Sequence, residues 1–264
     1  MPCNVYTVPP GEPFLERLAR AILNGDLPHP GSPRPDALSL QDMTLLLPTR
    51  RAARVLHAAF LKVSGARALL MPRIRPIAEG DEDLTLLSGL AGLTTLGAAG
   101  ADLPPAVPPM ERTLTLMQLV LHWRGVMAND DPDQQSAASN TPAQAAALAS
   151  DLAKLMDQIE TENVALSDLG RLVPDVYAHH WKKTVDFLRI VTEFWPIHLK
   201  ERGFISAAGR RNAMIAAEAE RLTSLPPGAP VVVAGVTGSI PATVTLMRAV
   251  AALDNGAIVL PALD

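Results

Sequence analysis

One stretch limits the fold of this chain more than any other: residues 43–63, which read MTLLLPTRRAARVLHAAFLKV. Its first part, Met43–Leu47, is a short apolar run without polar alternation, which favours a strand covered on both faces, as in a parallel sheet. Pro48 ends this strand because proline has no backbone N–H for a sheet hydrogen bond. Thr49 is suited to cap a helix that follows. The stretch therefore predicts a buried strand that leads directly into a helix.

The predicted helix after Thr49 has one apolar face and one basic face. Its apolar residues recur at i, i+3, i+4 and i+7 and are Leu56, Ala59, Phe60 and Val63. Arg50, Arg54 and His57 fall on the opposite face, with Arg51 beside them. The positive end of a helix dipole disfavours cations in the first turn, by roughly a few tenths of a kcal/mol each. A bound anion would offset this cost, and a solvated arginine face on a surface helix is the alternative that stays open.

The composition narrows the class of protein. The 264 residues are 48% apolar and 19% charged, which is typical of a globular chain rather than a disordered one. Since the net charge is −4, binding to nucleic acid would require a local basic patch. A single cysteine, Cys3, excludes an internal disulfide and a cysteine metal cage, and fits a reducing cytosol. Neither a membrane-spanning run nor a signal-peptide pattern is present, so we expect a cytoplasmic protein with no membrane partner.

The N-terminal segment has the backbone pattern of a phosphate-binding loop without its chemistry. Val5–Val8 predicts a short strand, and a helix is expected to begin near Pro13. The loop between them reads PPGE, where a working phosphate loop needs several glycines, a lysine and a Ser or Thr. Glu12 would repel a phosphate. We therefore interpret Pro10, Gly11 and Glu12 as a degenerate nucleotide loop.

A second strand–helix unit lies near the C-terminal end. Val231–Ala234 is all apolar and predicts a buried strand, followed by a helix and a last strand at Ala257–Leu260. Residues 235–239, GVTGS, come at the carboxyl end of a strand, where ligands bind in parallel sheets. Thr237 and Ser239 are candidates to cap the helix or to contact a phosphate.

Helical patterns fill the middle of the chain. Helices are predicted at residues 110–127, 142–160, 177–202 and 207–222, with a bend near Pro196. Strand–helix units at both ends bracket this block, which predicts an α/β domain with a parallel sheet and an inserted helical domain. The expected boundaries are residues 1–80 with 226–264 for the α/β domain, and residues 81–225 for the insertion.

A second basic cluster, Arg73 and Arg75, follows a run at residues 68–72 that predicts another strand. The acidic run Glu79–Asp83 is consecutive and lacks the spacing that converges on an ion. No spaced Asp, Glu or His motif occurs elsewhere in the sequence. We therefore predict no catalytic residue and no metal site in this chain.

Six segments, taken together and in matching order, resemble the N-terminal part of the AddB family in the form found in alphaproteobacteria. They cover essentially the whole chain and read VYTVPPGEPFLERLARAIL, LLLPTRRAARVL, MPRIRPIAEGDED, PPMERTLTLMQLV, HHWKKTVDFLRIVTEFWP and VVVAGVTGSIPATVTLMRAV. AddB is the smaller subunit of the AddAB helicase–nuclease, which processes DNA double-strand breaks for homologous recombination. The resemblance implies a heterodimer with an AddA-type helicase–nuclease subunit.

The resemblance also implies a RecA-like domain, similar to superfamily 1 helicases but inactivated. The family's nuclease domain, with its iron–sulfur cluster and magnesium, lies C-terminal to the region matched here, so no cofactor and no enzymatic activity are expected of this chain, which would be a fragment. The residues agree, since Gly235 and Val236 stand where a helicase needs paired carboxylates for magnesium.

In related complexes the inactive helicase fold holds single-stranded DNA and scans it for the Chi recombination signal. By region, the residues that would contact DNA are Thr49, Arg50, Arg51, Arg54, Arg73 and Arg75. Two alternatives from other classes stay open. One is a structural scaffold for a partner helicase subunit without DNA contact, and the other is a nucleotide-binding enzyme that uses residues 235–239 as a phosphate cradle.

Overall fold

The computed structural model describes residues 4–36, 38–65, 69–77, 103–130, 141–164, 187–224 and 228–262. These residues belong to two compact units, one formed by residues 1–102 with 213–264 and the other by residues 103–212. The boundaries predicted from the sequence, 80/81 and 225/226, differ from these, since the helical unit begins and ends at residues 103 and 212.

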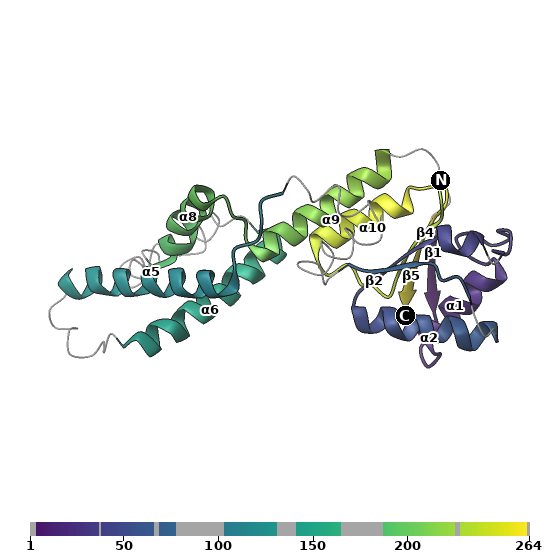
Figure 1. Cartoon of the computed structure of the whole chain (residues 1–264), viewed down its shortest axis with the longest axis horizontal. Coiled ribbons are helices and arrows are strands. Elements are labelled where there is room, and N and C mark those ends of the chain that lie inside the picture. Colours follow the sequence, from purple (N-terminus) through teal and green to yellow (C-terminus); the bar gives the residue numbers. More distant parts are fainter. Residues whose placement is uncertain are drawn as a thin grey trace, which may run out of the picture. The chain divides into compact units, whose positions relative to one another are not determined.

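The first unit contains a five-stranded sheet in the order β1-β5-β4-β2-β3 (Figure 1). The strands are β1 (Val5–Val8), β2 (Thr44–Leu47), β3 (Arg73–Pro76), β4 (Val231–Ala234) and β5 (Gly256–Pro261). Every pair of neighbours is parallel. The predicted α/β class with a parallel sheet is therefore confirmed.

Helices cover both faces of this sheet. The helices are α1 (Phe14–Asn24), α2 (Arg50–Ser64), α9 (Ala207–Ser224) and α10 (Pro241–Ala251), and a short 3₁₀ helix, Ser39–Asp42, precedes β2. Alternate residues of a strand point to opposite faces. Leu45 and Leu47 pack with α1 and α2, whereas Leu46 packs with α9 and α10. Burial on both faces explains why β2 and β4 read as continuous apolar runs.

One predicted strand is misplaced. The strand expected at residues 68–72 is absent from 69–72, and Arg73–Pro76 forms β3 instead. β3 pairs only with β2 among the described strands, with Arg73 N donating to Met43 O at 2.8 Å. An outermost strand tolerates charged residues and proline, so the basic cluster itself enters the sheet while the apolar run before it does not.

The second unit is helical, as the sequence predicted. It contains α5 (Pro109–Asp130), α6 (Pro142–Thr161), a π-helical segment (Ile190–Phe194), α8 (Trp195–Arg202) and the beginning of α9. The predicted cap of α6 is present, since Thr141 Oγ1 accepts a hydrogen bond from Gln144 N at 3.3 Å. Among the described residues, no helix is long and apolar enough to cross a membrane.

One predicted helix lies partly outside the described residues. In the described helices, α5 buries Leu116 and Val120, whereas Leu114 of α5 and Leu155 of α6 are 47% and 38% exposed. The predicted helix 177–202 is described only from residue 187, where a π-helical segment precedes α8. Pro196 lacks the N–H of a regular helical turn, which is consistent with irregular geometry before it.

Candidate nucleic-acid interface

The order of the strands creates a topological switch point at the carboxyl edge of the sheet. β2 and β4 are neighbours, but α2, which follows β2, and α10, which follows β4, cover opposite faces. Ligands bind outside the carboxyl ends of parallel strands at such a switch point. The segments that leave the two strands are residues 48–49 and 235–240. They lie against each other, since a Cβ built on Gly235 would lie 3.8 Å from Pro48 Cδ.

The start of α2 is firmly built. Thr49 Oγ1 accepts a hydrogen bond from Ala52 N at 3.1 Å, which confirms the predicted cap. Leu56 and Phe60 are fully buried in the core shared with α1 and the sheet. The first turn of α2 contains no acidic residue. The position of the helix terminus is therefore fixed by packing, while its polar groups carry no local countercharge from that turn.

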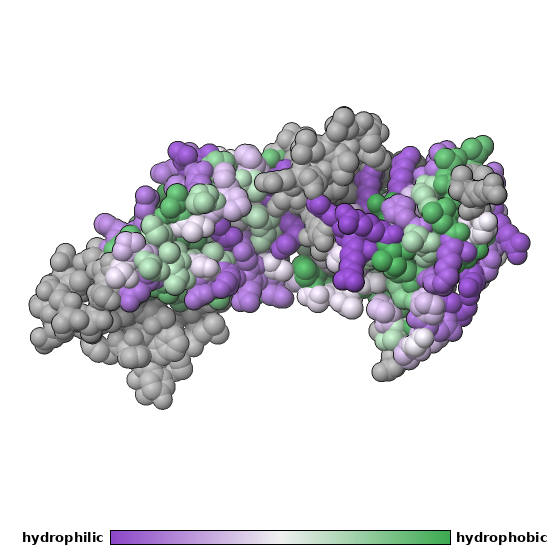
Figure 2. Space-filling model, turned by 60° about the horizontal axis from the view of Figure 1, so that its bottom comes forward, coloured by the Kyte–Doolittle hydropathy of each residue, from purple (hydrophilic) through white to green (hydrophobic). Residues whose placement is uncertain are grey.

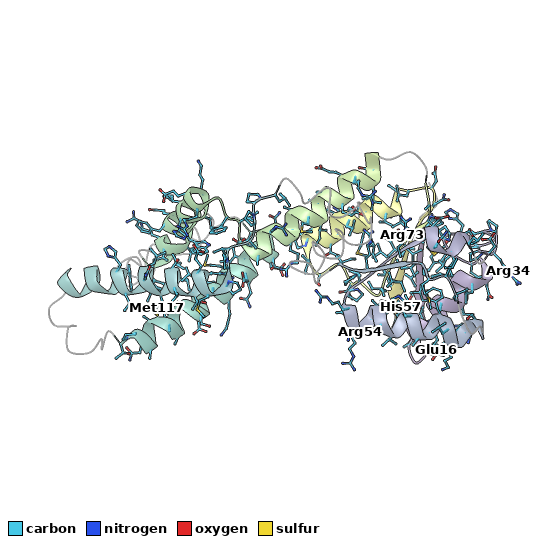
Figure 3. All side chains as sticks on the ribbon, in the orientation of Figure 1. Glu16, Arg34, Arg54, His57, Arg73 and Met117 are labelled. Carbon is cyan, nitrogen blue, oxygen red and sulfur yellow. The ribbon has the colours of Figure 1, made fainter. Side chains whose placement is uncertain are left out.

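Arg50, Arg51 and Arg54 are all exposed, as the helical spacing predicted. Figure 3 shows Arg54 extending away from the ribbon at the start of α2. Figure 2 brings this side forward and shows strongly hydrophilic surface over the start of α2. His57 lies one turn further along and donates from Nδ1 to Ala53 O at 2.8 Å. The three guanidinium groups thus form a basic cluster, here called the α2 arginines.

The second basic cluster lies elsewhere. Arg73 is paired in register with Thr44, the first residue of β2, so it sits at the amino edge of the sheet. Because Ile74 packs with α1 and α2, Arg73 and Arg75 point to the opposite face. Arg73 therefore lies at the opposite edge of the sheet from the start of α2, whereas Arg75, in register with Leu46, lies nearer the carboxyl edge but on the face away from α2.

Arg75 is half-buried beside a carboxylate of α9. Burial lowers the pKa of its guanidinium, and the nearby Glu218 carboxylate acts in the opposite direction. Glu218 is 3% exposed and accepts two hydrogen bonds from Arg221, each of 2.7 Å. A half-buried guanidinium beside a buried carboxylate on the α9 face is arranged to tie β3 to α9.

The degenerate loop after β1 offers no phosphate site. Gly11 has a φ of +87°, which the turn requires, and Glu12 forms an ion pair with Arg17. Glu16 is in the first turn of α1 and accepts a hydrogen bond from Lys62 Nζ at 2.6 Å. Carboxylates of the chain therefore occupy the surroundings of the α1 terminus, where a phosphate would be repelled.

An aromatic side chain fills the space beside Gly235, which the sequence analysis did not anticipate. A Cβ built on Gly235 would lie 3.3 Å from Cε1 and 3.8 Å from Cζ of Phe14. A helicase needs paired carboxylates for magnesium at this strand end. Here Gly235 has no side chain, and the Phe14 ring lies against it. An aromatic at the first helical position after a Pro-rich turn is the sequence signal that would have indicated it.

The loop after β4 differs from one prediction. Thr237 and Ser239 are exposed, but neither is the N-cap of α10, which is Ile240. Pro241 is favoured at the first helical position, and this places the cap on the residue before it. The hydroxyl groups of Thr237 and Ser239 are exposed to solvent in the segment that follows β4.

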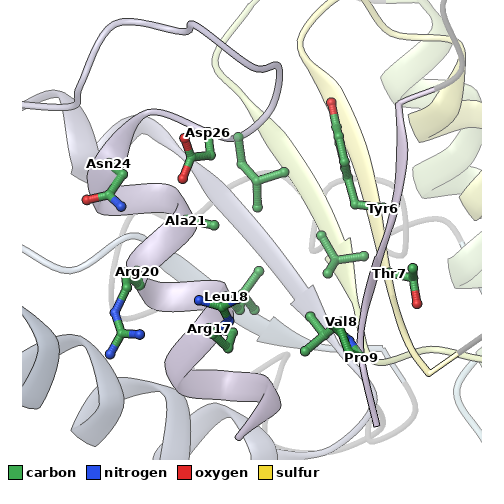
Figure 4. A pocket seen from close by; sticks show the side chains of 12 residues that line it. Tyr6, Thr7, Val8, Pro9, Arg17, Leu18, Arg20, Ala21, Asn24 and Asp26 are labelled. Carbon is green, nitrogen blue, oxygen red and sulfur yellow. The ribbon is translucent and has the colours of Figure 1, made fainter. Parts of the chain in front are cut away.

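A separate groove of about 250 Å³ lies between β1 and α1 (Figure 4). Its floor is apolar, and Tyr6 OH donates to Pro28 O at 2.9 Å beside it. Burial raises the pKa of Tyr6. The rim carries Arg17 and Arg20 but also Asp26, so it has no clear preference for one sign of charge.

In the parts of the chain that the structure describes, no group of three or more His, Cys, Asp or Glu side chains is arranged to hold a metal ion. Comparison with protein-family models and with curated proteins found no match to this chain. The features that bear on function are therefore the β2–β4 switch point, the α2 arginines beside it and the sequence resemblance.

Proposed function

We propose that this chain binds single-stranded DNA through the start of α2 and belongs to an inactivated, helicase-like subunit. The observation that carries the proposal is the exposed cluster of Arg50, Arg51 and Arg54 at a capped helix terminus beside the β2–β4 switch point. Backbone N–H groups, the helix dipole and guanidinium groups all favour an anion there. DNA phosphates are anions that such a cluster contacts without reading sequence.

The fold supports a RecA-like domain carrying a helical insertion. A parallel sheet with helices on both faces is the architecture of that class. The first unit is discontinuous in sequence, with the helical unit between its two parts. The inactivated character is supported by Glu12 at the first loop, by Phe14 beside Gly235, and by Gly235–Val236 in place of paired carboxylates.

The biological setting comes from the resemblance to AddB. In that setting this chain would act in the cytoplasm with an AddA-type subunit, in double-strand break repair by homologous recombination. It would hold single-stranded DNA while the complex searches for Chi. The iron–sulfur cluster and magnesium would belong to a nuclease domain outside this region.

Salt dependence of DNA binding tests the proposal. We expect the triple variant Arg50→Ala, Arg51→Ala, Arg54→Ala to weaken binding of an oligothymidine. The slope of log K against log salt concentration should also become shallower by about two units, because fewer phosphate contacts mean that fewer counterions are released on binding. The matched control replaces Arg20, Arg34 and Arg248, three exposed arginines at other places, and makes the same change in net charge. Equal affinity and slope for wild type and the α2 variant, measured by fluorescence anisotropy, would refute DNA binding at α2.

One observation favours the scaffold alternative. Val55 and Leu61 lie on α2 and are 49% and 41% exposed, although both are apolar. Exposed apolar side chains of this kind occur where a partner protein docks. The variant Val55→Asp with Leu61→Asp separates the two candidates. If the variant no longer binds the partner subunit while its DNA binding is unchanged, Val55 or Leu61 contacts the partner.

A further inference from the structure

Three chain segments meet around Gly235. Phe14 is the first residue of α1, Pro48 follows β2, and Gly235 follows β4. The Cβ position of Gly235 is 3.3 Å from the Phe14 ring and 3.8 Å from Pro48 Cδ. The ring and Pro48 therefore border the same space beside Gly235, at the switch point between β2 and β4.

The ring is held in place from its own helix. Leu18 and Ile22 of α1 are 1% and 0% exposed, and both belong to the core shared with α2 and the sheet. Arg17 N donates to Pro13 O at 3.0 Å, so the first turn of α1 is closed. The ion pair of Glu16 with Lys62 joins α1 to α2. The backbone from which the Phe14 ring extends is therefore anchored to the core and to α2.

Two features of Gly235 favour glycine beside the Phe14 ring. Its φ of +71° lies in the left-handed region, which favours glycine. A side chain there would also approach Phe14 closer than most Cβ contacts allow. The absence of a side chain after β4 therefore leaves room for the edge of an aromatic ring.

We propose that Phe14 is a positioning residue that takes the place of a nucleotide at the switch point and holds the Pro48–Thr49 segment, and with it the start of α2, in its binding geometry. The consequence is a DNA-binding edge that is permanently ordered and needs no nucleotide to assemble it. The statement about DNA rests on the proposed function, whereas the statement about Phe14, Pro48 and Gly235 stands without it.

Hydrogen exchange tests, without DNA, whether the Phe14 ring holds the Pro48–Thr49 segment in place. In the full chain, Phe14→Ala removes the ring and should speed exchange of the Ala52 amide, which Thr49 caps, by about tenfold through easier local opening. Leu15→Ala is the matched control, since Leu15 is the next residue of α1 and packs against the same core. Phe14→Leu keeps an apolar side chain and should restore most of the protection. Equal acceleration at Ala52 in the Phe14 and Leu15 variants would overturn the proposal.

A double-mutant cycle tests the direct contact. Gly235→Ala introduces strain from its positive φ in any background, but its methyl group meets the ring only when Phe14 is present. We expect Gly235→Ala to lower the folding equilibrium constant about threefold more in wild type than in Phe14→Leu. If the effects of the two substitutions on the folding free energy add strictly, the ring and Gly235 are not coupled, and the proposed role of Phe14 is rejected.

DNA binding then separates the two proposals. If the chain binds DNA through the α2 arginines, Phe14→Ala should weaken oligothymidine binding about tenfold while Leu15→Ala does not, at equal folded fraction. If wild type binds no DNA, the proposed function fails, and exchange and the mutant cycle still decide the role of Phe14. If DNA binds equally to wild type and Phe14→Ala, Phe14 does not position the interface, and that part of the inference fails.

Discussion

Single residues at the ends of the strands decide whether this sheet forms. Gly256 begins β5, and a Cβ built on it would overlap Val250 O and would lie 3.0 Å from Leu253 Cβ. Its own carbonyl accepts a hydrogen bond from Asn4 Nδ2 at 2.9 Å. The strand therefore starts against the end of α10 with no room for a side chain, although its backbone conformation is one that other residues adopt.

We predict that Gly256→Ala destabilises the first unit by about 3 kcal/mol, because the backbone must shift to admit the methyl group. Gly31→Ala is the control, since Gly31 has a φ of +86° but open space around its Cβ position. It should cost about 1 kcal/mol from backbone strain alone. Urea unfolding followed by circular dichroism measures both, and equal costs would contradict the steric argument.

Residue identity also sets what the sequence could reveal about the site. The cap by Thr49 and the exposure of Arg50, Arg51 and Arg54 depend on spacing within one helix, and the sequence predicted them. The place of Phe14 depends on which strand lies beside which, and local spacing contains no such information.

At the scale of elements, the junction between α6 and α9 contains a half-buried carboxyl group, that of Glu160. Ser206 Oγ donates to Glu160 Oε2 at 2.5 Å and accepts from Gly209 N at 3.0 Å. Asn212 Nδ2 donates to Glu160 O at 2.7 Å. Burial raises the pKa of Glu160, while the hydrogen bond from Ser206 and the charge of Arg112 act against the shift and Asp157 adds to it.

A raised carboxyl pKa gives a definite sign to the pH dependence. The unfolded chain releases this proton near pH 4.5, whereas the folded chain retains it to higher pH. The contribution of Glu160 to stability is therefore fully present below pH 4.5 and is lost as pH rises through the folded-state pKa. We predict that Glu160→Gln gains stability relative to wild type as pH rises from 4.5.

The comparison with Glu160→Gln cancels the other carboxyl groups, including Glu193, whose pKa is lowered by Arg189. Unfolding followed by tryptophan fluorescence reports on this unit, because Trp123 and Trp195 lie in it. Wild type and variant with parallel stability curves across this pH range would show that burial of Glu160 has no energetic consequence.

Element by element, periodicity predicted the type of structure better than its exact position. β4 has the predicted limits because an apolar run between Pro230 and Gly235 leaves little choice, and β1 ends before Pro9 as predicted. β3 was misplaced because the position of an outer strand is set by its pairing with β2 and not by apolar residues.

At the scale of the whole molecule, the sequence indicated a discontinuous α/β unit, but not which basic clusters share a surface. Arg73 and Arg75 follow the α2 arginines closely in sequence, yet strand register separates them by placing Arg73 at the amino edge. The separation gives a testable difference: Arg73→Ala should leave oligothymidine affinity within about twofold of wild type, since only local phosphate contacts contribute strongly.

The residues at the β2–β4 switch point also determine how the whole chain responds to nucleotide. A ligand that binds only the folded state adds about 2.7 kcal/mol of stability at a hundredfold excess over Kd, and so raises the melting temperature. With carboxylates near the α1 terminus and Phe14 against Gly235, magnesium-ATP has no cradle in the described residues. We predict that millimolar magnesium-ATP leaves the melting temperature unchanged, whereas oligothymidine at low salt raises it. Inorganic triphosphate is the control, because it reports charge attraction to the α2 arginines alone. A rise with ATP that exceeds the rise with triphosphate and disappears in Gly235→Ala would show a nucleotide site and contradict the reading of Phe14 as its replacement.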